Sequence, residues 1–149
     1  MGARYLTLLG LLCFAVYTDM TRTKISNRLI VSGLILALIF RIAEEGGSGA
    51  LVYMMNISIP VIMLYLFYLI GVLGAGDIKL FSMIGAFIST QELVWVVAAS
   101  FIIGAVLGLL KLLHKYFLQK NYDGKLTKIH FSPAIIIAYL INIWRCTHG

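Results

Sequence analysis

The chain has 149 residues, of which 61% are hydrophobic and 12% are charged, and its mean hydropathy is +0.98. A soluble domain of this length could not hide so much apolar surface, so the composition indicates an integral membrane protein and excludes an ordinary soluble one. The formal net charge of +6 does not indicate nucleic-acid binding, because the basic residues cluster between apolar segments and no basic surface interleaved with aromatic residues is evident.

Six apolar segments follow one another along the chain, and we expect each to be a membrane-spanning helix within a single domain over residues 1–149. The first resembles a signal peptide, but it lacks a small-x-small cleavage site and ends in Asp19 and a basic loop, so it is predicted to be a retained helix. The first and fourth segments are short against the roughly 20 residues that a bilayer requires. The six segments are Arg4–Thr18, Arg28–Ala43, Leu51–Leu73, Ile78–Thr90, Leu93–His114 and Phe131–Arg145.

Lysine and arginine are distributed unequally between the two sides of this arrangement. Nine lie in or close to the loops that follow odd-numbered segments, namely Arg22, Lys24, Arg28, Lys79, Lys111, Lys115, Lys120, Lys125 and Lys128. The other side has three, namely Arg4, Arg41 and Arg145. Because cytoplasmic loops carry the excess of basic residues, the odd-numbered loops are predicted to be cytoplasmic and both termini external.

Two aspartates lie at segment ends on the predicted cytoplasmic side. Asp19 ends the first segment and Asp77 follows the third, so an even number of crossings separates them. Both carboxylates therefore belong to the same face of the membrane. Asp123, the other acid on that side, lies inside a long polar loop.

A pair of facing carboxylates is sufficient for peptide hydrolysis without a metal. Two such groups a few Å apart cannot both ionise easily, so they share one proton. The ionised partner takes a proton from water, and the protonated partner donates to the scissile carbonyl. The histidines and the two cysteines, Cys13 and Cys146, have no metal-ligand spacing, so we expect no metal and no other cofactor.

The stretch "GAGDIKL" places two glycines directly before Asp77. Without side chains, Gly74 and Gly76 could let an extended substrate approach closely, or could adopt positive φ. The alternative is a plain helix break with Asp77 as the N-cap of the next helix. Lys79 could reach lipid headgroups or act on the neighbouring carboxylate.

Other polar and proline residues have ordinary structural interpretations. Asp19 could simply mark a helix end, and either Ser26 or Asn27 could cap the second helix, with Asn27 favoured. Pro133 is expected in the first turn of the last helix, and Pro60 could kink the third.

The motifs together resemble those of a known family of membrane peptidases. "GAGDIKL" resembles the GxGD signature of membrane aspartic peptidases, and "YTDMTRTKISN" is similar to the first-aspartate motif of type IV prepilin peptidases. "FSPAIIIA" is similar to their closing proline-containing span. The resemblance implies a six-helix peptidase with catalytic Asp19 and Asp77, and with Gly74, Gly76 and Lys79 at the substrate.

The resemblance also implies a substrate and a location. Relatives cut the basic leader from prepilin-like precursors, after a glycine that precedes a hydrophobic helix, at the cytoplasmic face of the cell membrane. Here Ile25-Ser26-Asn27 replaces the family's Ile-Pro-Asn. The cysteine-containing insertion of the longer, methylating relatives is missing, so methylation is not expected.

Two other functions are compatible with a small polytopic protein that carries two acids. One is a transporter or proton channel, although both acids map to one face and no inverted repeat is visible. The other is a non-catalytic subunit of a pilus-assembly machine.

Overall fold

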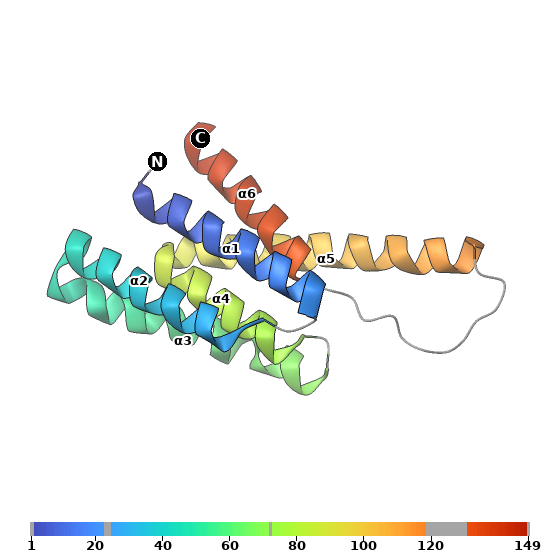
Figure 1. Cartoon of the computed structure of the whole chain (residues 1–149), viewed down its shortest axis with the longest axis horizontal. Helices are drawn as coiled ribbons and strands as arrows, with labels where there is room; N and C mark the ends of the chain where they lie inside the picture. Colours follow the sequence, from blue (N-terminus) through green and yellow to red (C-terminus); the bar gives the residue numbers. More distant parts are fainter. Residues whose placement is uncertain (1, 23–24, 72, 119–130, 149) are drawn as a thin grey trace.

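The computed structural model describes residues 2–22, 25–71, 73–118 and 131–148, and within them every regular element is a helix. Successive helices run in opposite directions, and the two termini lie at the same end of the bundle (Figure 1). Asp123 and the rest of the polar stretch at 119–130 lie outside the described residues. The helices are α1 (Ala3–Arg22), α2 (Asn27–Glu45), α3 (Gly47–Leu69), α4 (Ala75–Phe87), α5 (Thr90–Leu118) and α6 (Ser132–His148).

The all-helical class is confirmed, and the described residues form six helices, of which the first and the fifth are longer than expected. Helix α1 has 20 residues and continues to Arg22, so the expectation of a short first helix was wrong. Helix α4 is short, as predicted, with 13 residues. In the part of the chain that the structure describes, three helical stretches are long and apolar enough to cross a membrane, namely Ala3–Thr21, Gly47–Leu69 and Thr90–His114.

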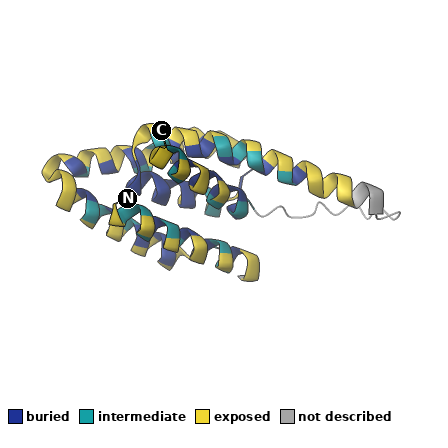
Figure 2. Cartoon of the chain, turned by 90° about the horizontal axis from the view of Figure 1, so that it is seen from above, coloured by how far each residue is buried: buried dark blue, intermediate teal, exposed yellow. Residues whose placement is uncertain are grey.

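Helix α4 is the centre of the bundle. Its residues from Leu80 to Phe87 are all buried, because α4 packs against α1, α2, α3 and α5. Figure 2 shows the buried residues gathered on the inner sides of the helices. A helix that is apolar all round is a core helix. Gly85 lets α3 approach, since a Cβ there would lie 2.5 Å from the carbonyl oxygen of Asn56.

The outer faces of α3 and α5 are apolar and exposed. Large side chains stand outward along both helices, far more than a soluble monomer tolerates. Such a surface is stable in contact with lipid, and it agrees with a membrane protein. The exposed apolar residues include Leu51, Met54, Met55, Ile62 and Leu66 on α3 and Ile102, Leu109 and Leu110 on α5.

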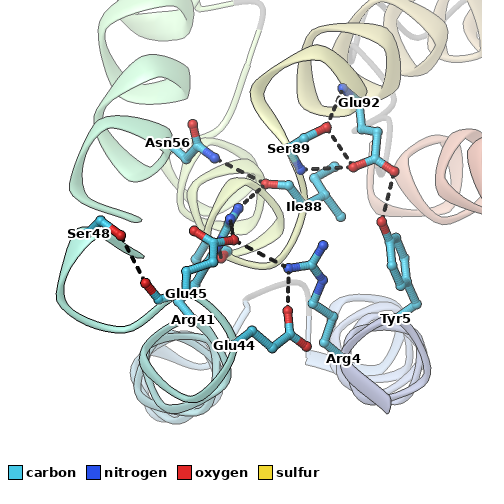
Figure 3. A network of polar contacts seen from close by, with 11 residues as sticks. Arg4, Tyr5, Arg41, Glu44, Glu45, Ser48, Asn56, Ile88, Ser89 and Glu92 are labelled. Atoms are coloured by element: carbon cyan, nitrogen blue, oxygen red, sulfur yellow. Dashed lines mark hydrogen bonds and ion pairs between the residues drawn. The ribbon is translucent and has the colours of Figure 1, made fainter. Parts of the chain in front are cut away.

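The carboxyl end of α4 is held by a buried arginine (Figure 3). Arg41 of α2, 4% exposed, donates from Nε to the carbonyl of Ala86 at 3.3 Å and from Nη2 to that of Ile88 at 2.7 Å. Asn56 of α3 donates to the same Ile88 carbonyl at 3.1 Å. A cation is favourable at this position, because the last carbonyls of a helix are otherwise unpaired and partly negative.

Further polar contacts close the same end of the bundle. Arg4 of α1 pairs with Glu44 of α2 at 2.9 Å, and the Tyr5 hydroxyl donates to Glu92 of α5 at 3.0 Å. Glu92 also accepts from the backbone N–H of Ser89 at 2.9 Å (Figure 3). These contacts tie α1, α2 and α5 together at the end opposite to the two aspartates.

Candidate active site

Asp19 lies in the last turn of α1, inside the helix and not beyond it. Its side chain is buried, with 9% exposed. The hydroxyl of Ser132, the first residue of α6, donates to its Oδ2 at 2.8 Å. A carboxylate near a helix C-terminus faces the negative end of the macrodipole, so it is poorly placed as a mere helix terminator.

Asp77 lies in the first turn of α4 and is partly exposed. Its Oδ2 accepts from the backbone N–H of Gly74 at 3.2 Å. Gly74 is the N-cap residue, so the alternative that placed Asp77 at the N-cap is wrong. A carboxylate three residues into a helix is favourable, because it satisfies an unpaired N–H and faces the positive end of the macrodipole.

The glycines before Asp77 have ordinary backbone angles. Gly74 has φ −80° and ψ 150°, so it does not adopt positive φ. A Cβ on Gly74 would lie 3.2 Å from Asp77 Oδ2, which is a tight contact, whereas a Cβ on Gly76 would lie 3.5 Å from Ile25 Cδ1. Glycine at 74 therefore leaves room for the Asp77 carboxylate. The positive φ in this region belongs to Gly71, at 79°, just after α3.

The two aspartate motifs touch one another. Gly76, beside Asp77, lies against Ile25, which follows α1 and precedes α2. Lys79 Nζ donates to Asn27 Oδ1 at 3.0 Å. Helix α4 packs against α1 and α2, and the end of α1 and the starts of α4 and α6 lie at one end of the bundle (Figure 1).

Asn27 has a different role from the predicted one. Ser26 is the N-cap residue of α2 and makes no side-chain hydrogen bond to the helix, and Asn27 is the first helical residue. The expected Asn27 cap is therefore wrong. Pro133 does lie in the first turn of α6, as predicted, and Pro60 lies inside α3.

Sequence reasoning missed Ser132 and the buried state of Arg41. The only sequence signal for Ser132 is its place before Pro133, which marks a helix start and not a partner for Asp19. The sequence pattern marks Arg41 only as a basic residue on the external side, yet it is buried against the end of α4. Among the described residues, no three acidic, histidine or cysteine side chains gather into a metal-binding group.

A hollow of about 340 Å³ lies at the opposite end of the bundle. It is lined by Tyr5 near the start of α1 and by Ile143, Cys146 and Thr147 near the end of α6. None of these residues belongs to the aspartate motifs. The aspartate motifs and the hollow therefore lie at different ends of the bundle.

A model of the type IV leader peptidase family matches residues 6–109. This range includes Asp19 and Asp77 and ends before α6. No curated protein and no solved structure matched the chain.

Proposed function

The chain belongs to the type IV leader peptidase family, and we propose that it is a membrane aspartic endopeptidase in which Asp19 and Asp77 are the catalytic pair. The observation that carries this proposal is the contact between the two motifs. Gly76 lies against Ile25, and Lys79 is hydrogen-bonded to Asn27. The segments that bear the two aspartates are thus neighbours at one end of the bundle.

The two carboxylates would divide the chemistry between them. The ionised carboxylate takes a proton from water, and the water oxygen attacks the scissile carbonyl carbon. The protonated carboxylate gives its proton to the carbonyl oxygen. The tetrahedral intermediate then breaks its C–N bond, and the leaving amine takes a proton from the acid formed in the first step. As the new C=O bond forms, a hydroxyl of the intermediate returns a proton to the carboxylate that donated one before, so the pair is restored. Neither aspartate is assigned one role in advance, because two carboxyl groups that share one proton are not distinguished by sequence or position.

We propose a prepilin-like precursor as the substrate, with a basic leader followed by a hydrophobic helix. The substrate helix would lie in the bilayer and its leader at the cytoplasmic face of the cell membrane. The nine-to-three distribution of basic residues supports cytoplasmic placement of the aspartate end. Gly74, Gly76 and Lys79 lie at the start of α4, where the two glycines would line the bound peptide and Lys79 would align this segment through its bond to Asn27.

Cleavage of a synthetic precursor by the purified chain in detergent tests this function. The peptide joins a basic leader, a glycine and a hydrophobic helix, and product masses locate the cut. We expect one cut after the glycine, unchanged by a chelator. An intact peptide, together with proton flux through the chain in liposomes, would instead identify a transporter or channel.

A further inference from the structure

A buried hydrogen bond joins the first and last helices at the candidate active site. The Ser132 hydroxyl donates to Asp19 Oδ2 at 2.8 Å, across 113 positions of sequence. Ser132 is fully buried and is the first residue of α6. The family match ends at residue 109, so it assigns nothing to Ser132.

We propose that Ser132 is a positioning residue for the Asp19 carboxyl group, an inference that rests on the proposed function. A serine hydroxyl carries one donor and two acceptor sites, and it rotates to suit its partner. It therefore donates to Asp19 when the carboxylate is ionised and accepts from it when the carboxyl is protonated. The Asp19 side chain therefore keeps one orientation whether its carboxyl group is ionised or protonated. A mechanism in which two carboxyl groups share one proton requires both of these states.

The bond differs from those of the other buried serines. Ser82 of α4 donates to the carbonyl of Ile78, and Ser100 of α5 donates to the carbonyl of Val96, each within its own helix. Such bonds only satisfy a buried hydroxyl. Ser132 instead reaches across to another helix and contacts a proposed catalytic group.

The packing of α6 makes this contact possible. Helix α6 packs against α1, and the Tyr139 hydroxyl donates to the backbone carbonyl of Tyr5 at 3.1 Å. Ala134, Ile135 and Ala138 are buried on the same helix. The start of α6 is thus fixed relative to the end of α1, so the Ser132 hydroxyl is held in place.

Steady-state cleavage by Ser132→Ala tests the proposal. Loss of a hydrogen bond to a charged group in a catalytic step should lower kcat by about tenfold to a hundredfold. KM should stay within about twofold, because Ser132 is fully buried and is not expected to contact the substrate. Ser100→Ala is the matched control, since it also removes a buried hydroxyl, and it should keep the wild-type kcat. A wild-type kcat for Ser132→Ala would overturn the proposal.

A second measurement does not depend on activity. Thermal unfolding of Asp19→Ala, Ser132→Ala and the double variant forms a double-mutant cycle. If the two side chains interact, the fall in Tm of the double variant is smaller than the sum of the two single falls. Additive falls would contradict the pairing.

The proposed function and the proposed role of Ser132 can be disproved independently of one another. Full cleavage by Asp19→Asn would remove the proposed function and leave any measured coupling intact. Wild-type kcat in Ser132→Ala, alongside an inactive Asp19→Asn, would remove only the role of Ser132.

Discussion

Lys79 at the start of α4 donates a hydrogen bond to Asn27 at the start of α2, with 3.0 Å between Nζ and Oδ1. This bond joins the segment after the first aspartate to the helix that carries the second. The two side chains are exposed, so the bond between them adds little to stability. We expect it to matter because it aligns the two segments that carry the aspartates.

We therefore predict that Lys79→Met and Asn27→Ala each lower kcat/KM by a similar factor. The double variant should be no worse than either single one, because both substitutions break the same bond. The measurement is steady-state cleavage, with Tm recorded for each variant. A large loss in Lys79→Met with normal cleavage by Asn27→Ala would show that Lys79 acts directly on the substrate.

Gly74 and Gly76 should respond differently to alanine. A Cβ at Gly74 would lie 3.2 Å from Asp77 Oδ2, so Gly74→Ala should displace the carboxylate and lower kcat by about tenfold. Gly76→Ala makes only an ordinary contact in the peptide-free protein, so its main effect should be a higher KM if the substrate lies along it.

Gly10→Ala is the control for both glycine variants, because nothing lies within 4 Å of a Cβ at that position. It should cleave like the wild type. Unchanged kcat in Gly74→Ala would mean that the space beside Asp77 is not needed.

Arg41→Met should lower the free energy of unfolding by about 2–4 kcal/mol, because it removes buried donors from the carbonyls of Ala86 and Ile88. Arg4→Met breaks a more exposed pair with Glu44 and should cost about 1 kcal/mol or less. Chemical denaturation in detergent measures both. Equal stability of the two variants would show that the Arg41 contacts do not hold α4.

Much of this arrangement could be predicted from the sequence, for physical reasons. The apolar runs located all six helices, because an apolar run of helical length is a strong local signal. The GxGD pattern and the first-aspartate motif pointed to one site, and the contacts of Gly76 and Lys79 now join these segments. The short α4 was predicted because polar residues bound it on both sides.

The remaining features depend on packing between helices, which local sequence does not encode. Asp19 proved to be helical because Thr21 and Arg22 extend α1 past the apolar run. The contact of Ser132 with Asp19 requires α6 to pack on α1. Arg41 looked like a loop charge, although the unpaired carbonyls at the end of α4 provide its buried partners.

The predicted membrane orientation is tested by cysteine labelling in intact cells. The native Cys13 and Cys146 are both exposed, so they must first be replaced by alanine. A membrane-impermeant thiol reagent should then label Glu45→Cys, which is predicted to be external, and leave Lys120→Cys unlabelled until the cells are opened. Labelling only at position 120 in intact cells would reverse the orientation.

Cleavage by Asp19→Asn and Asp77→Asn tests the catalytic pair most directly. An amide can neither take a proton from water nor share one with its partner, so each variant should lose about a thousandfold or more in kcat. The double variant should be little worse than either single one, because the two residues act as a unit. Glu44→Gln, at the opposite end of the bundle, is the control and should cut normally. Substantial cleavage by folded Asp77→Asn, or inhibition by a chelator that added zinc reverses, would contradict the aspartic mechanism.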